Sequence, residues 1–271
     1  MSEHPDVDPI QKLIEHFITR AREEMDARLG QWTIDLTHEE VHEVLGALLA
    51  RQVTLACEMA ICPSFWTGHT APLVIRAMAD AHISLAWVIQ EPVTRSRQFI
   101  HYGLGQAKLQ LEHRKAELKT SERVSTEEEQ YIESLEAWIN EQRWTFLTDV
   151  HLGSWSGIST RKMAEEAGCL DFYNYVYTPF SACTHSMWNH IALYNLRGCR
   201  NPLHKFHQVG GVVDTEIDGH FLYLAAKYLQ KSFATFDDAI GTKVSGESAF
   251  EVLCRELESL RPEPSAAESE N

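Results

Sequence analysis

The sequence predicts an all-α protein, a multi-helix bundle in which most neighbouring helices run antiparallel. Apolar residues recur at spacings of three and four through long segments, and proline, glycine and capping residues separate these segments. No segment shows convincing strand alternation, and 44% apolar residues suffice for a large core. We expect one helical domain over residues 1–260, with its core at about 37–245. Residues 261–271 are an acidic tail, rich in serine and proline, that we expect to be disordered.

Three long helices are expected in the first third of the chain. The first follows Asp8 and Pro9, an N-cap with proline at the first helical position, and ends near Gly30. The second starts at Thr37, because residues 37–40 have the form of a capping box. The third runs from about residue 70 to 90 and is apolar on every side, which predicts the most buried helix of the bundle.

The remaining helices are shorter or more polar. A helix from Pro92 to about Lys119 and one capped by Ser125 form a predicted helical hairpin whose second helix reaches Phe146. Residues 198–215 have no helical period and predict a long loop. The other helices are expected at residues 159–167, 170–177, 178–196, 216–240 and 247–260.

Charge and cysteine content limit the function classes. The formal net charge is −15, and protonation of all 14 histidines would still leave it negative, which excludes a basic surface that coats nucleic acid. Charged residues interrupt the longest apolar segments, so we expect no membrane span. The first nine residues lack the pattern of a signal peptide, and the six cysteines form no C-x-x-C pair. We therefore expect a reduced, cytoplasmic protein.

Two apolar helices each carry a polar stripe. Arg76 and Asp80 lie four residues apart on the third helix, and Tyr177, Ser181 and His185 recur every four residues on a later one. Trp188 continues roughly the same stripe. Because a guanidinium inside a bundle needs hydrogen-bonding partners from a neighbouring helix, we expect the two stripes to face each other.

The stripes allow two interpretations. In the functional one His185 is an acid or base near neutral pH, Arg76 stabilises an anion, and Ser181 and Tyr177 position the substrate. His101 and Tyr102 on the fourth helix are further candidate substrate contacts. In the structural one, the same polar residues form a satisfied network that fixes the register of the helices.

The R-x-x-x-D segment at residues 76–80, followed by Y-x-x-x-S-x-x-x-H at 177–185, resembles an uncharacterised bacterial all-helical family of unknown function. The resemblance covers roughly residues 40–240, and the family usually has glutamate in place of Asp80. More distantly, the chain is similar to the HEPN superfamily of helical bundles, many of them RNases of toxin and antiphage systems. Their motif is an arginine followed four to six residues later by a histidine, and Arg76 with His82 fits that spacing. Asp80 and His82, however, lie about 200° apart around a helix.

The resemblance to HEPN proteins implies a homodimer and metal-independent RNA cleavage. In the hypothesis that combines it with the two polar stripes, His185 is the acid or base and Arg76 the phosphate clamp. Asp80 would orient Arg76. We expect no cofactor, no DNA partner and no membrane partner. The basic residues that could contact RNA phosphates are most numerous on the fourth helix and around the long loop. Those on the helix are also explained by an ordinary solvent-exposed helix face. The competing hypothesis is a non-catalytic helical binding or regulatory protein that docks a partner through its acidic surface.

Two groups of potential metal ligands remain alternatives to a metal-free protein. His38 and His42 belong to an H-E-x-x-H sequence, but His38 falls at the start of a helix and no third ligand is evident. Cys199, His204 and His207 lie in one loop, although their spacing matches no standard zinc motif.

Overall fold

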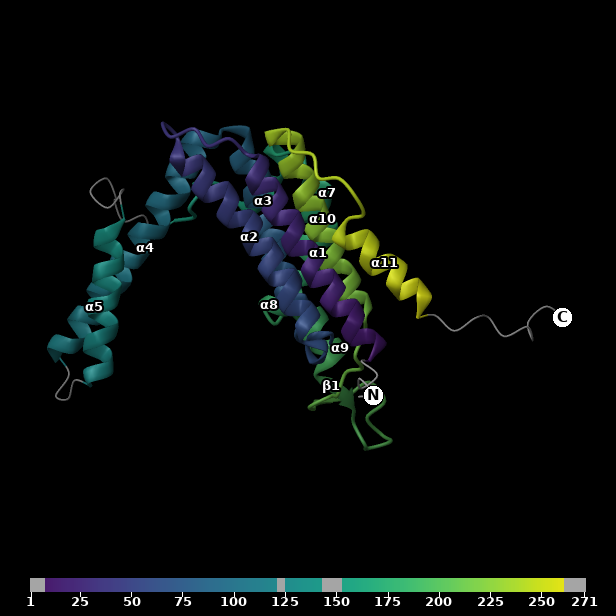
Figure 1. Ribbon diagram of the computed structural model, residues 1–271. Coiled ribbons are helices and arrows are strands. Elements are labelled where there is room, and N and C mark those ends of the chain that lie inside the picture. Colours follow the sequence, from purple (N-terminus) through teal and green to yellow (C-terminus); the bar gives the residue numbers. More distant parts are fainter. Residues whose placement is uncertain (1–7, 121–124, 143–152, 261–271) are drawn as a thin grey trace, which may run out of the picture.

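The computed structural model describes residues 8–120, 125–142 and 153–260, and it confirms the all-α fold (Figure 1). A single pair of three-residue strands interrupts the helices in the described ranges. The elements are α1 (Pro9–Gln31), α2 (Glu39–Ile61), η1 (Pro63–Phe65), α3 (Ala71–Gln90), α4 (Pro92–Thr120), α5 (Thr126–Glu141), α6 (Thr160–Glu166), α7 (Leu170–Phe172), the π-helix η3 (Tyr173–Tyr177), α8 (Thr178–Thr184), α9 (Trp188–Tyr194), β1 (Leu196–Gly198), β2 (Gln208–Gly210), α10 (His220–Ile240) and α11 (Ala249–Ser259).

Helix α3 is the centre of the bundle, as its all-round apolar sequence predicts. It packs against α2, α6, α8 and α10, and Ile75, Met78 and Ile83 are fully buried. Pro72 lies in the first turn of α3, and the chain has no further proline or glycine before Pro92. Helices α1, α2, α3 and α10 lie side by side in Figure 1, so residues on α3 are held by neighbours on several sides.

Helices α4 and α5 form an arm that leaves the body of the molecule (Figure 1). The arm has its own small apolar cluster, built around Leu111, Ile132 and Ile139 and separate from the main core. Ser125 caps α5 through a capping box with Glu128, as predicted. The predicted helical hairpin is therefore confirmed, while its tip at residues 121–124 and the predicted helix end at Phe146 lie outside the described residues.

The predicted start of the second helix was wrong. Helix α2 begins at Glu39, and its N-cap is His38, which makes no side-chain capping bond. The Asp35 carboxylate instead accepts both the backbone N–H of Thr37, at 2.8 Å, and the Thr37 hydroxyl, at 2.6 Å. Because this Asx-turn uses the Thr37 side chain, Thr37 is not available to cap the helix.

The segment predicted as an irregular loop contains a small β-hairpin. Strands β1 and β2 pair antiparallel, with Arg197 opposite Val209. Three residues per strand are too few to produce a visible alternation in the sequence, which is why the strands were not predicted. The following helix, α10, starts at His220 rather than at residue 216, because the Asp218 carboxylate accepts the His220 N–H at 2.8 Å and turns the chain there.

Helices α2 and α3 are long and apolar enough to cross a membrane when judged by length and composition alone. In the structure 61% and 72% of the respective apolar windows are buried inside the bundle. Core helices of soluble proteins pass the same test, so this finding is weak evidence for a membrane location. The cytoplasmic location stays a prediction.

His82 joins α3 to α10 inside the core. Its side chain is 1% exposed, its Nδ1 lies 3.0 Å from the Ser232 hydroxyl, and its ring packs on Phe172. Burial, with a smaller contribution from the charge of Lys231, lowers the pKa of His82 from 6.5 to about 3. The imidazole is therefore neutral in the folded protein at physiological pH.

We predict a pH-dependent loss of stability that originates at His82. Its folded pKa lies below the unfolded value, so its stabilising effect is complete above pH 6.5 and decreases as the pH falls towards 3. Between pH 7.5 and 5, His82 should remove about 2 kcal/mol of unfolding free energy. Urea unfolding at both pH values should show a smaller decrease in His82→Asn than in wild type. Replacement of the exposed His220 by Asn should keep the wild-type decrease; equal decreases in all three proteins would contradict the assignment.

Candidate functional site

The side chain of Arg76 lies between α3 and α8, where it brings the two polar stripes together. Its Nε donates a hydrogen bond to the Ser181 hydroxyl at 2.7 Å, and its Nη1 pairs with the Asp80 carboxylate one turn further along α3. The Arg76 side chain is only 9% exposed. The juxtaposition expected from the four-residue spacings is thus present in the structure.

The Tyr177 ring, from the π-helix η3, packs against the flat face of the Arg76 guanidinium. The Cζ atom of Arg76 lies 3.3 Å from the centroid of the Tyr177 ring, and the Tyr173 ring stacks on Tyr177 at 4.7 Å. The Tyr177 hydroxyl donates to Thr160 Oγ1 at 3.4 Å. Tyr177 therefore positions Arg76 with its ring through a cation–π contact, while its hydroxyl contacts α6.

The Ser181 hydroxyl is fully engaged in positioning. It accepts the bond from Arg76 and donates to the Tyr177 carbonyl oxygen at 2.7 Å. A hydroxyl whose proton is already donated to the backbone is poorly placed to act as a nucleophile. Ser181 is best described as a group that fixes the direction of the guanidinium.

Asp80 and His185 lie at the solvent-exposed rim of this site. The Asp80 side chain is 50% exposed, whereas His185 is exposed at the C-terminal end of α8. Partial burial raises the pKa of Asp80, and the charges of Arg76 and His185 act in the opposite direction. A cation at the floor with a carboxylate and an imidazole at the rim can bind an anion and transfer a proton beside it.

A second buried arginine, Arg28, makes more hydrogen bonds than Arg76 does. Arg28 donates from Nε and Nη2 to both oxygens of Asp237, at 2.8 and 2.7 Å, and from Nη1 to Glu24. Arg76 uses Nε and Nη1, and among the described residues its Nη2 has no hydrogen-bond partner. Arg28 thus makes four hydrogen bonds and Arg76 makes two, so Arg76 keeps more of its five donors for a ligand.

His185 owes its position to a turn that the sequence pattern did not indicate. One helix was predicted over residues 178–196, but α8 ends at Thr184 and α9 begins at Trp188. Between them Ser186 has a positive φ of 49°, and the N–H groups of Ser186 and Met187 bond back to Cys183 and Ala182 in a Schellman motif. The break puts His185 at a helix end, and it leaves Trp188 72% exposed, so Trp188 does not extend the buried stripe.

His101 and Tyr102 lie in a different hollow. They line a space of about 680 Å³ together with Arg97, Gln98 and Trp155. Trp155 packs on Trp87, which is about 16 Å along α3 from Arg76. The structure does not bring His101 and Tyr102 to the Arg76 site, so grouping them with it was wrong.

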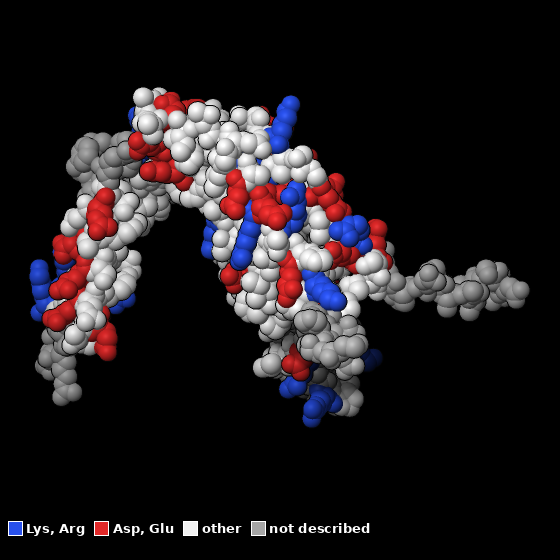
Figure 2. Space-filling view, in the orientation of Figure 1, with Lys and Arg blue, Asp and Glu red and all other residues white. Residues whose placement is uncertain are grey.

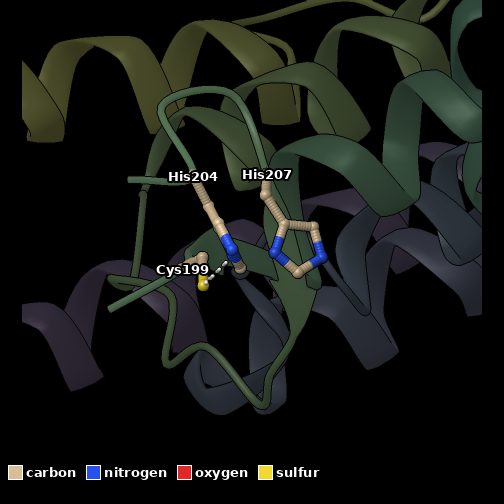
Figure 3. Close-up of side chains that lie close together, drawn as sticks. All are labelled: Cys199, His204 and His207. Atoms are coloured by element: carbon tan, nitrogen blue, oxygen red, sulfur yellow. Dashed lines mark hydrogen bonds between the residues drawn. The ribbon is translucent and has the colours of Figure 1, made fainter. Parts of the chain in front are cut away.

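The two groups of potential metal ligands differ in the structure. His38 Nδ1 lies 3.1 Å from Asp35 Oδ2, and the His42 ring packs on Trp32 at 4.4 Å. In the part of the chain that the structure describes, the one group of three ligand atoms close enough to share an ion is Cys199, His204 and His207, in the β1–β2 loop (Figure 3).

Fold and site together define an all-helical protein with a partly buried arginine site between two helices. The chain belongs to a family of unknown function, DUF5677, whose model matches residues 42–201, more than half of the sequence. The match includes both polar stripes and ends inside the β1–β2 loop, before His204 and His207. No curated protein and no solved structure matches the chain.

Sequence reasoning missed two contributors to the site. Tyr173, which stacks on Tyr177, lies four residues before it and extends the same spacing backwards, so the signal was present. Thr160, which accepts the Tyr177 hydroxyl, comes from α6, and no local pattern connects the two residues.

We predict that Ser181→Ala lowers the free energy of unfolding by about 1–2 kcal/mol, because a buried charged donor loses its acceptor. The matched control is Ser96→Ala: Ser96 is also buried, and its hydroxyl has no hydrogen-bond partner in the described structure. The control should leave stability unchanged or raise it. Urea unfolding measures both variants, and equal effects would contradict the role given to Ser181.

We predict that Ser186→Gly raises the free energy of unfolding by about 1 kcal/mol, because glycine adopts a positive φ without steric cost. Asn195→Gly serves as the control, since Asn195 ends α9 with a φ of −129°. Thermal or urea unfolding that shows destabilisation in both variants would rule out backbone strain at Ser186.

Proposed function

We propose that this protein cleaves RNA without a metal ion, with Arg76 as the phosphate-binding group and His185 as the proton-transfer group. The observation that carries the proposal is a guanidinium fixed on three sides, with unused donors, beside an exposed imidazole. Preorganised charge of this kind stabilises a transition state better than a flexible side chain does.

In this proposal each of these groups has one part in the reaction. His185 removes the proton of a ribose 2′-OH, the 2′ oxygen attacks phosphorus, and the bond from phosphorus to the 5′ oxygen breaks. The leaving 5′ oxygen takes up a proton from solvent water, and His185 returns its proton to solvent, so the products carry a 2′,3′-cyclic phosphate and a 5′-OH. Arg76 holds the phosphate oxygens through Nη2, and Asp80 keeps the guanidinium in place.

The similarity to HEPN proteins supports the reaction class but needs a different histidine here. His82 has the HEPN spacing from Arg76, yet it is buried, bonded to Ser232 and held neutral by a pKa of about 3. His185 is the exposed imidazole near Asp80 and takes that role in our proposal. The toxin or antiphage setting and the homodimer are proposed from the same similarity.

The distribution of cations favours one end of the molecule for RNA. Three of the cations on α4 are paired with acids: Lys115 with Glu136 at 2.7 Å, Arg97 with Glu40 at 2.7 Å, and Arg95 with Glu91 at 3.0 Å. The β1–β2 hairpin contributes Arg197, Arg200 and Lys205, for which the described structure shows no ion pair. Figure 2 shows Lys and Arg at the end of the body where Figure 1 draws this hairpin, and Lys and Arg mixed with acids along the arm.

A second candidate is a non-catalytic binding or regulatory protein. It is favoured by the low exposure of Arg76 and by the complete use of the Ser181 hydroxyl, both of which suit a network that fixes helix register. In that case the acidic surface would contact a partner.

Cleavage of labelled RNA in the presence of a chelator tests the proposal. Wild type should produce cyclic-phosphate ends, and both His185→Ala and Arg76→Lys should reduce the rate by about 100-fold or more. His220→Ala, which removes an exposed histidine from α10, should cleave normally.

Circular dichroism and thermal unfolding would check that the variants remain folded. No cleavage by wild type, or cleavage unchanged in both site variants, would overturn the catalytic proposal and favour the second candidate.

A further inference from the structure

The loop between β1 and β2 brings together three side chains that are good ligands for a transition metal (Figure 3). One ligand atom each from Cys199, His204 and His207 lies within 4.8 Å of the others. Cys199 is partly buried, and both histidines are exposed. This group is separate from the Arg76 site and takes no part in the proposed cleavage.

The spacing of the ligand atoms fits zinc. Tetrahedral Zn²⁺ with ordinary Zn–S and Zn–N bonds places its sulfur and nitrogen ligands about 3.6 Å apart. The Sγ of Cys199 and the Nδ1 of His204 are separated by 3.7 Å. The third ligand atom, from His207, lies within 4.8 Å of the other two and needs to move by no more than about 1.5 Å to complete the same geometry.

Backbone hydrogen bonds hold the three ligands on one side of the loop. The Cys199 N–H donates to the His207 carbonyl at 3.0 Å, which places these two residues opposite each other at the base of the loop. The N–H of His207 donates in turn to the His204 carbonyl at 3.1 Å. The ligands are therefore close together before an ion is bound, which lowers the entropy lost on binding.

Asn201 supports the group from within the loop. Its backbone N–H lies 3.5 Å from Cys199 Sγ, in position to donate to the sulfur. A backbone N–H directed at a ligating sulfur orients that ligand in metal sites.

The loop has no apolar core to keep it closed. Its two large apolar residues, Leu203 and Phe206, are 87% and 97% exposed, and each strand at its base has three residues. Small units that bury little apolar surface are commonly held together by a disulfide or a metal ion. Cys199 is a free cysteine, so a disulfide does not serve this purpose.

We propose that this loop binds one zinc ion through the Cys199 thiolate and ring nitrogens of His204 and His207, with water as the fourth ligand. One thiolate and two imidazoles are a donor set that suits zinc and not magnesium or calcium. Binding releases the thiol proton of Cys199, and the bound ion holds the hairpin closed.

Titration with Co²⁺, which reports on zinc sites by its colour, tests the proposal. One Co²⁺ per chain should bind, with visible bands typical of tetrahedral geometry and a thiolate-to-cobalt charge-transfer band, and Zn²⁺ should displace it. Cys199→Ser should abolish the charge-transfer band. His204→Ala and His207→Ala should each weaken binding by about tenfold or more.

The matched controls are Cys62→Ser, which removes another partly buried thiol, and His38→Ala, which removes a histidine of the H-E-x-x-H sequence. Both should bind Co²⁺ as wild type does. Absence of the charge-transfer band in wild type, its persistence in Cys199→Ser, or an equal loss in the controls would overturn the site. Because the three ligand residues lie in a solvent-exposed loop, circular dichroism should show the helices unchanged in every variant.

Discussion

The burial of the Arg76 guanidinium between α3 and α8 is the constraint on which the rest of the site depends. A charge that is 9% exposed is costly unless its donors are paired, and Asp80, Ser181 and the Tyr177 ring provide the pairing. Any sliding of α8 along α3 would break these contacts together. The segment from Leu170 to Thr184 is therefore locked in register, and the turn that carries His185 follows from its end.

The two buried arginines differ in how many hydrogen bonds their guanidinium groups make among the described residues. The Arg28 guanidinium packs on the Phe233 ring, with Cζ 3.9 Å from the ring centroid, and donates hydrogen bonds to Asp237 and Glu24. Arg28 therefore joins α1 to α10. Arg76 rests on Tyr177 in the same way but faces a half-exposed carboxylate and retains Nη2. Burial, which the two arginines share, therefore does not distinguish them; the half-exposed carboxylate beside Arg76 does.

Much of the fold could be predicted because its signals are local. Asp8 and Ser125 cap helices as their sequence positions indicate, and the four-residue spacings correctly brought Arg76 and Ser181 together. The wrong predictions have two causes: a competing hydrogen bond, or the absence of a signal in the sequence. Asp35 binds the Thr37 side chain that would have capped α2, and the αL position after His185 is held by Ser186, which gives none of the warning that a glycine would. His101 was misplaced because composition does not say which end of α3 a residue on α4 approaches.

Helix α9 lies between α8, which carries part of the Arg76 site, and the β1–β2 hairpin, although the chemistry proposed for the two is independent. The Tyr194 ring of α9 packs on His69 at 5.3 Å, and the Cys183 thiol, near the end of α8, donates to the His69 carbonyl. Both helices therefore contact His69, which lies two residues before α3. The hairpin follows directly after α9. An ion in the loop would hold the hairpin closed, yet none of the Arg76 contacts involves a loop residue. Removing the ion therefore leaves the guanidinium and its partners in place, and the fate of one proposal does not decide the other.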